Sequence, residues 1–187
     1  MSATPVKSQL QKQTWTKNQF LVSTDPALVP ISKLLEVFDS EDFYWAKTMP
    51  AQAMREMLDH SLTFGLYEQL RHDGESLPSP DLKFIGLARC VTDFTTFVYL
   101  TDVWVDPSYQ GNGLGTWLVG CVREVLESMP NVRRSLLFTA DWERSVPFYQ
   151  RFLGMTLIET RKGEALAIME KKGKGHPAYG REGTGYD

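Results

Sequence analysis

The sequence predicts one mixed α/β (α+β) domain, in which strands and helices alternate around a central sheet. Its 187 residues are enough for one well-buried domain of this kind and few for two. Residues 97–105 are rich in aromatic and β-branched residues and contain no glycine or proline, which is typical of a buried strand. This strand leads through a glycine-rich loop into an amphipathic helix, so the chain contains a clear strand-to-helix junction.

Strand and helix patterns alternate in the first half of the chain. Residues 1–17 carry little apolar pattern, so we expect them to form a flexible N-terminal arm. Apolar residues then recur at strand or helix spacing, and a segment rich in turn residues interrupts them. The predicted elements are a strand at 19–24, helices from Pro30 and over 50–60, strands at 62–67 and 84–91, and an exposed loop at 71–80.

The second half continues the alternation after the strand at 97–105. The helix that begins at Leu114 has one apolar face, because its apolar residues recur three and four positions apart. Pro147 is tolerated only in a first helical turn, which limits how early the next helix can begin. The remaining predicted elements are a strand at 132–140, a helix over 145–153, a hairpin of 155–160 with 164–170, and a flexible tail at 172–187.

The loop between the strand and the helix has the composition of an anion-binding site. Gly111, Gly113 and Gly115 remove the side chains that would keep a ligand away from the backbone. The helix that follows offers unpaired N–H groups and a partial positive charge at its N-terminus. We therefore expect an anionic group, such as a phosphate, at this junction.

Spacing distinguishes among three phosphate-binding designs. The lysine of a Walker loop is missing, and G-x-G-x-G past the middle of the chain differs from the G-x-G-x-x-G of dinucleotide-binding folds. The segment from Gln110 to Gly115 instead resembles the [Gln/Arg]-x-x-Gly-x-[Gly/Ala] loop of the GNAT superfamily of N-acetyltransferases, at all three defining positions. In that superfamily the loop holds the pyrophosphate of acetyl-coenzyme A.

A second signature extends the resemblance over residues 82–170. Phe148 and Tyr149, followed by Gly154 and Met155, resemble the Phe-Tyr and Gly-Phe pairs of the family, while Trp142 and Ser145 replace a usual asparagine and alanine. The resemblance implies the GNAT fold, a mixed and mostly antiparallel sheet that splays at the acetyl-CoA site. It also implies a set of cofactor-binding residues: Val103, Trp104, Val105, Gln110, Gly111, Asn112, Gly113, Leu114, Gly115 and Thr116.

Acetyl transfer to an amine needs a group that accepts the proton of the amine and a group that protonates the departing thiolate. The resemblance places Tyr149 opposite the sulfur of coenzyme A as the proton donor, and the alternative is an aromatic residue that only packs against the helix and the cofactor. Asp102 is the first candidate base, and the alternative is a carboxylate satisfied by a backbone amide or by Arg89. A backbone N–H within 103–105 is expected to polarise the thioester carbonyl.

Selection of the acceptor is expected in the first third of the chain. Three acidic residues and one serine precede three aromatic residues there, Phe43, Tyr44 and Trp45. Acidic groups beside aromatic faces suit a cationic amine, and the alternative is a solvated acidic turn followed by packing residues. Arg89 could bind a carboxylate of the acceptor or could pair with a neighbouring aspartate.

Composition argues against several other classes of protein. Hydrophobic residues make up 42% and charged residues 23%, with neither a secretory signal nor an apolar run that could span a membrane, so a cytosolic or nuclear protein is expected. The net charge of −3 disfavours nucleic-acid binding. Cys90 and Cys121 are expected to be reduced core residues, and the three scattered histidines suggest no metal site.

These observations predict a single acetyltransferase domain over 18–171. It would transfer the acetyl group directly from acetyl-CoA to a primary amine of a small molecule or peptide, because no cysteine is placed for an acyl-enzyme intermediate. A homodimer is compatible with the resemblance, since many similar proteins dimerise. The rival hypothesis is a non-catalytic protein that binds or senses acyl-CoA on the same fold.

Overall fold

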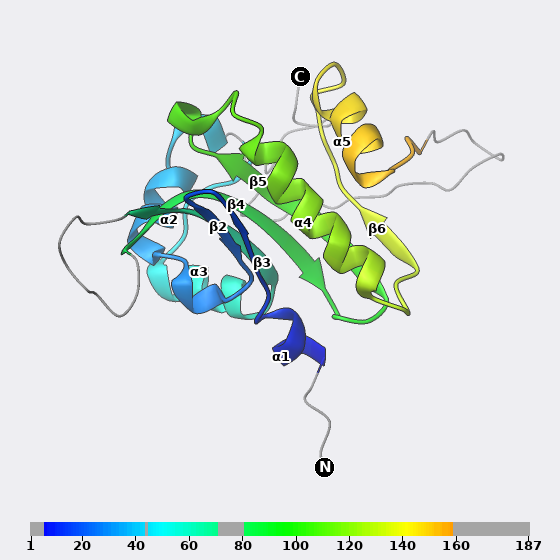
Figure 1. Ribbon diagram of the computed structural model, residues 1–187, viewed down its shortest axis with the longest axis horizontal. Helices are drawn as coiled ribbons and strands as arrows, with labels where there is room; N and C mark the ends of the chain where they lie inside the picture. Colours follow the sequence, from blue (N-terminus) through cyan, green and yellow to red (C-terminus); the bar gives the residue numbers. More distant parts are fainter. Residues whose placement is uncertain (1–5, 44, 71–80, 159–187) are drawn as a thin grey trace, which may run out of the picture.

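The computed structural model describes residues 6–43, 45–70 and 81–158, and its centre is one sheet of six strands (Figure 1). The strands lie side by side in chain order. Neighbours from β1 to β5 are antiparallel, and β6 is parallel to β5, so the predicted mixed and mostly antiparallel sheet is confirmed. The strands are β1 (Thr14–Lys17), β2 (Phe20–Ser23), β3 (Leu62–Leu70), β4 (Asp81–Thr92), β5 (Phe97–Val105) and β6 (Arg134–Leu136).

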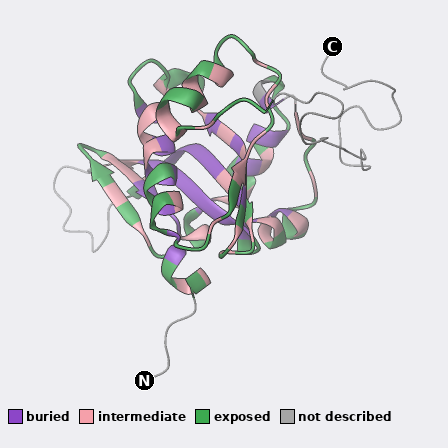
Figure 2. Ribbon diagram, turned by 90° about the vertical axis from the view of Figure 1, so that its right-hand side faces the viewer, coloured by how far each residue is buried: buried purple, intermediate pink, exposed green. Residues whose placement is uncertain are grey.

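Helices cover both faces of this sheet. The α-helices are α1 (Val6–Leu10), α2 (Ile31–Phe38), α3 (Ala51–Asp59), α4 (Leu114–Ser128) and α5 (Ser145–Leu153). The described residues also form the 3₁₀ turns η1 (Pro26–Leu28), η2 (Glu41–Phe43) and η3 (Pro107–Tyr109), each of which precedes one of these helices. Buried residues gather in the middle strands, between the more exposed outer surfaces of the helices (Figure 2).

The alternation of side chains along each strand divides the core into two clusters. Phe64, Ala88 and Leu100 pack with α4 on one face of the sheet. Leu87 and Trp104 pack with α2 and α3 on the opposite face. Each face therefore has its own hydrophobic support, and we call them the α4 face and the α2/α3 face.

Strand β5 contains a bulge at Asp102. Trp104 pairs with Leu87 and Thr101 pairs with Arg89, so two residues of β5 oppose one residue of β4. Asp102 has a φ of +51°, a left-handed conformation that few residues other than glycine, asparagine and aspartate adopt. The strand is therefore irregular just before it reaches the glycine loop.

Strands β5 and β6 separate soon after they meet. They pair only from Phe97 with Arg134 to Tyr99 with Leu136, where β6 ends. Strand β5 continues to Val105, and beyond Tyr99 its edge has no neighbouring strand on that side among the described residues. The sheet is thus splayed at the position expected for the GNAT fold.

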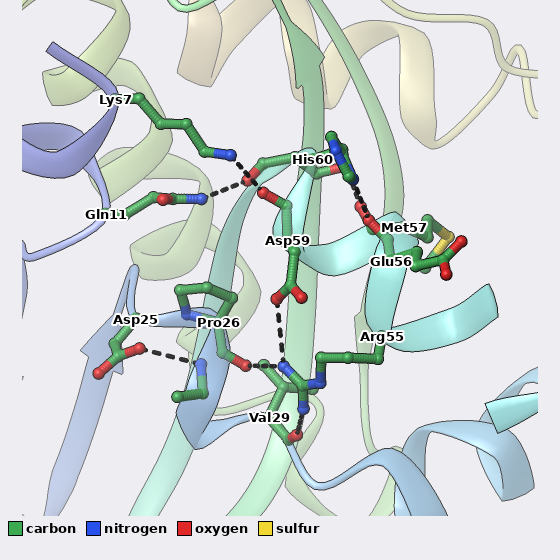
Figure 3. A network of polar contacts seen from close by, with 12 residues as sticks. Lys7, Gln11, Asp25, Pro26, Val29, Arg55, Glu56, Met57, Asp59 and His60 are labelled. Carbon is green, nitrogen blue, oxygen red and sulfur yellow. Dashed lines mark hydrogen bonds and ion pairs between the residues drawn. The ribbon is translucent and has the colours of Figure 1, made fainter. Parts of the chain in front are cut away.

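The expectation of a flexible arm is wrong for residues 6–17, which form α1 and β1. Lys7 Nζ donates to the carbonyl oxygen of Asp59 at 2.6 Å, so α1 is tied to the end of α3 (Figure 3). Trp15 Nε1 donates to Glu124 Oε2 at 2.7 Å, which ties β1 to α4. The pattern was missed because β1 is an edge strand with mostly exposed side chains, so it lacks apolar alternation.

The C-terminal predictions are only partly tested. The predicted strand at 132–140 is too long, because β6 covers only Arg134–Leu136. Residues 155–158, where the hairpin was predicted to begin, form no strand in the structure. The rest of that hairpin, the tail at 172–187 and the loop at 71–80 lie outside the described residues.

Candidate functional site

The glycine loop ends in an open helix N-terminus. Gly113 is the N-cap of α4 with a φ of +72°, and Gly111 has a φ of +81°. A side chain at either position would meet no atom within 4 Å, so the space above the loop is open. The N-cap is a glycine and has no side chain to cap the helix, so the N–H groups of the first turn have no capping partner among the described residues and are available to a ligand. This geometry suits an anionic group.

Side chains around the loop hold it in place. Gln110 Nε2 donates to the carbonyl oxygen of Val105 at 2.8 Å, so this side chain closes the loop onto β5. Asp106 caps η3 by accepting from the backbone N–H of Ser108 at 2.9 Å. Asn112 Nδ2 makes a longer contact of 3.4 Å to the carbonyl oxygen of Tyr109. The loop is therefore shaped by its own polar residues.

Tyr109, which sequence analysis did not identify, connects the loop to β3 and β4. Its hydroxyl donates to Glu68 Oε2 at 2.6 Å and accepts from Lys83 Nζ at 2.8 Å. The hydrogen bond to Tyr109 raises the pKa of Lys83. Only the three-dimensional pairing of distant segments shows this contact, since Glu68 and Tyr109 are 41 residues apart in sequence.

The remaining predicted cofactor residues lie along β5 and the first turn of α4. Val103 and Val105 are half-buried and pack toward the α4 face, whereas Trp104 is buried in the cluster of the α2/α3 face. Leu114 is buried in the core, so it would offer a ligand only its backbone. Gly115 and Thr116 are half-buried in the first turn of α4.

Tyr149 lies on α5 and packs against the core cluster of α4. Phe148 contacts its ring edge-on, with centroids 5.1 Å apart. Burial raises the pKa of Tyr149 to about 12, so its hydroxyl keeps its proton at neutral pH. Trp142, which replaces the usual asparagine of the family, is 64% exposed ahead of this helix.

Asp102 is a buried carboxylate with several hydrogen-bond donors. Arg89 Nε donates to its Oδ2 at 2.6 Å, and the Arg89 and Asp102 side chains are only 14% and 4% exposed. Trp45 Nε1 and Thr101 Oγ1 donate to its Oδ1 at 3.3 and 3.2 Å. Arg89 Nη1 also donates to Ser61 Oγ at 3.1 Å, so the network reaches the end of α3. Arg89 is thus a side-chain partner of Asp102, and the role of Asp102 as a base stays a prediction.

The predicted acceptor residues are divided by the fold. Trp45 and Arg89 meet at Asp102, although they come from segments far apart in the chain. Phe43 is only 1% exposed, and its ring stacks on Phe38 and contacts the tilted Trp45 ring at centroid distances of 4.1 and 4.2 Å, so it packs against the indole. Tyr44 lies outside the described residues.

The two candidate catalytic residues do not lie on one face. Tyr149 packs toward the α4 face, and the carboxylate of Asp102 points to Trp45 on the opposite side. Asp102 lies on β5, the strand at the splayed edge, and Tyr149 lies on α5, which follows β6 in the chain and packs on α4.

The two cysteines of the described residues form no disulfide bond. Cys90 and Cys121 are both buried and free, as predicted. In the part of the chain that the structure describes, no three His, Cys, Asp or Glu side chains form a metal-binding group. None of the described helices combines the length and apolar character needed to span a membrane.

Several known proteins resemble this chain in sequence and in fold. The profile of the acetyltransferase (GNAT) family matches residues 33–155. A Gibberella zeae protein described as a candidate acetyltransferase is 35% identical over 173 residues, which are 88% of this chain and 96% of that protein. The crystal structure of a candidate GNAT acetyltransferase from Xanthomonas campestris is 31% identical, with a TM-score of 0.60 over 82% of this chain and 92% of that one.

A more distant structure shows the same architecture. A GNAT family acetyltransferase from Streptococcus pneumoniae is 21% identical, with a TM-score of 0.54 over 82% of this chain and 98% of that one. The family profile covers the glycine loop, the splayed edge and α5, which are the parts that the sequence motifs had singled out. The chain therefore belongs to the GNAT family of acetyltransferases.

Proposed function

We propose that this protein is an acetyl-CoA-dependent N-acetyltransferase that transfers the acetyl group directly to a primary amine of a small molecule or peptide. One observation carries the proposal: the glycine loop joins the uncapped N-terminus of α4 to β5, a strand whose edge beyond Tyr99 has no neighbour among the described residues. Pyrophosphate would bind the N–H groups of the loop, and the pantetheine amides would pair with the backbone of 103–105 as an added strand does. The thioester would then lie beside the splay.

Tyr149 is the proposed proton donor to the departing thiolate. Its raised pKa keeps the phenol protonated, and an acid of this kind can protonate a thiolate as negative charge develops on the sulfur. A backbone N–H on β5 would polarise the thioester carbonyl in the same step. Transfer then needs no covalent enzyme intermediate, and both cysteines are buried away from such a role.

Asp102 has two proposed roles in the reaction, as the base for the amine or as a group that positions its neighbours. Its three side-chain donors support the positioning role, because they occupy both carboxylate oxygens. In that role Asp102 holds Trp45 beside the splay, where the indole face could contact a cationic amine. A water chain could then carry the amine proton to solvent.

The rival function is a protein that binds or senses acyl-CoA without catalysis. The exposed Trp142 at a position usually held by asparagine favours this alternative, because contacts made by that asparagine are lost. Both functions require coenzyme A binding, and only one requires turnover.

The proposal is tested by two measurements on the purified protein. Calorimetric titration with acetyl-CoA should show saturable binding to one site, and a thiol assay should show release of CoA that depends on an added amine. Binding together with amine-dependent release supports the transferase. Binding without release from any amine of a broad panel supports the sensor, and absence of binding rejects both functions.

A further inference from the structure

Three buried polar atoms on the α2/α3 face have no hydrogen-bond partner among the described residues. They are the Thr63 and Tyr67 hydroxyl oxygens and the Trp104 indole nitrogen. Thr63 and Tyr67 are each 1% exposed, and Trp104 is 8% exposed. Folded proteins satisfy nearly all such groups with protein, water or ligand. Three such atoms on one face of the sheet therefore point to a partner that the described residues do not supply.

The register of the sheet places these atoms in two adjacent rows. Gly65 of β3 pairs with Leu87 of β4, which pairs with Trp104 of β5. The Tyr67 phenol lies over this row, because a Cβ built on Gly65 would be 2.2 Å from the Tyr67 hydroxyl oxygen. The missing side chain of Gly65 thus makes room for the phenol to lie back along the strand.

The second row contains the network of Asp102. Thr63 lies two residues before Gly65 on the same face of β3, about 7 Å along the strand. It pairs with Arg89, which pairs with Thr101 beside Asp102. Arg89 and Trp45 are half-buried. The two rows therefore run inward from these partly exposed side chains to the Tyr67 hydroxyl.

The charges in these rows favour a neutral oxygen as the ligand atom. Arg89 and Asp102 form an ion pair, so neither charge is left uncompensated. Burial, with a smaller contribution from Asp25, raises the pKa of Tyr67, so its hydroxyl keeps its proton. The deeper row thus offers a phenol O–H and an indole N–H as donors, and the second row adds the Thr63 hydroxyl.

We propose that these two rows form the subsite for the polar part of the acceptor, which is an amine that also carries a neutral hydroxyl or carbonyl oxygen. Tyr67 and Thr63 would hydrogen-bond that oxygen and so select amino alcohols and amino-acid amides over alkylamines of equal size. This inference rests on the proposed acetyl transfer and adds a substrate class to it. An ordered water is the other molecule that could satisfy these hydroxyls.

Removal of the Tyr67 hydroxyl separates a ligand subsite from a structural role. Because the hydroxyl has no partner among the described residues, Tyr67→Phe breaks no hydrogen bond with any of them and removes the cost of burying an unpaired group. The variant should melt at the same temperature as the unmodified protein or higher. If an ordered water holds this hydroxyl, the variant should instead melt at a lower temperature.

The experiment compares matched amines in the CoA release assay. The pairs are 3-amino-1-propanol with butylamine, and glycinamide with isobutylamine. The unmodified protein should prefer the oxygen-bearing amine by at least about tenfold in kcat/KM. Tyr67→Phe and Thr63→Val should each reduce that preference severalfold, mainly through a higher KM for the acceptor, with the Kd for acetyl-CoA unchanged.

Ser128→Ala is the control, because its hydroxyl does have a partner, the carbonyl oxygen of Val125 at 2.7 Å. It should lower the melting temperature and leave the amine preference intact. Lack of preference in the unmodified protein, turnover of neither amine in both pairs despite acetyl-CoA binding, or a Tyr67→Phe variant with unchanged preference would each overturn the inference. Failure of the unmodified protein to bind acetyl-CoA would instead refute the proposed function.

Discussion

The two faces of the sheet form their candidate sites from different chemical groups, backbone on one face and side chains on the other. On the α4 side, the candidate cofactor site consists of glycine backbone and uncapped N–H groups with open space above them. On the α2/α3 side, the candidate acceptor site consists of buried side chains that hydrogen-bond one another, centred on Arg89 and Asp102. A main-chain site tolerates change in most side chains, whereas a side-chain site changes with each substitution. Acceptor selection can therefore diverge while the cofactor site stays constant.

Blocking the glycine loop should have the largest effect of the changes considered, and this effect should be on the affinity for acetyl-CoA alone. Gly113→Glu puts a carboxylate where an anion should bind and forces a non-glycine residue to a φ of +72°. We expect the affinity for acetyl-CoA in calorimetric titration to fall by roughly 100-fold or more. Gly120→Ala is the matched control, since the added methyl group on α4 would meet no atom within 4 Å. An affinity retained in Gly113→Glu would place the cofactor elsewhere.

Breaking the ion pair should affect the acceptor side and the stability of the fold. Arg89→Leu leaves the Asp102 carboxylate buried beside Trp45 and Thr101 as its remaining side-chain donors. Removing one partner of a buried pair costs about 3–5 kcal/mol, which urea denaturation would measure as a lower free energy of unfolding. The double variant Arg89→Leu with Asp102→Asn should recover part of this loss. A loss below about 1 kcal/mol would show that the pair behaves as a surface ion pair.

Tyr149→Phe tests whether the cofactor side supplies a chemical group as well as a binding surface. We expect kcat to fall by about 10- to 100-fold with an unchanged acetyl-CoA affinity, because only the proton donor is lost. Since the pKa of Tyr149 is about 12, the phenol stays protonated as the pH rises, and no loss of activity between pH 7 and 10 should come from its ionisation. Full activity of the variant in steady-state kinetics would leave Tyr149 a packing residue.

Removing the hydrogen bond that ties β1 to α4 should have the smallest effect. Trp15→Phe keeps the aromatic contact with Phe64 and removes the hydrogen bond from the indole nitrogen to Glu124. We expect a loss of about 1 kcal/mol in unfolding free energy, with both substrate affinities unchanged. A change in either affinity would mean that the N-terminal hairpin is coupled to one of the two sites.

The same contrast explains what could be predicted from the sequence. The loop from Gln110 to Gly115 was recognisable because a main-chain site needs glycines at fixed spacing, and α5 was correctly predicted to begin at Ser145. Helix periodicity likewise identified α4, whose apolar face is buried in the structure. Local patterns suffice where the structure depends on neighbours within a few residues.

The candidate acceptor site could be identified only from the three-dimensional structure. Trp45 and Asp102 are 57 residues apart, and no local pattern indicates that the indole donates to that carboxylate. Thr63 and Tyr67 looked like ordinary strand residues until the register placed them beside Arg89 and over Gly65. Strand β1 was missed for a similar reason, because its polar edge is stabilised by long-range contacts such as Trp15 with Glu124.

The bulge at Asp102 also limits how the length of β5 can change in evolution. Val98 and Leu100 face α4 before the bulge, and Val103 and Val105 face the same side after it, so the extra residue exchanges even and odd positions. Deletion of one residue here would turn the rest of the strand over, directing Trp104 toward α4 and both valines away from it. Single-residue insertions or deletions in this segment should therefore be selected against far more strongly than most substitutions.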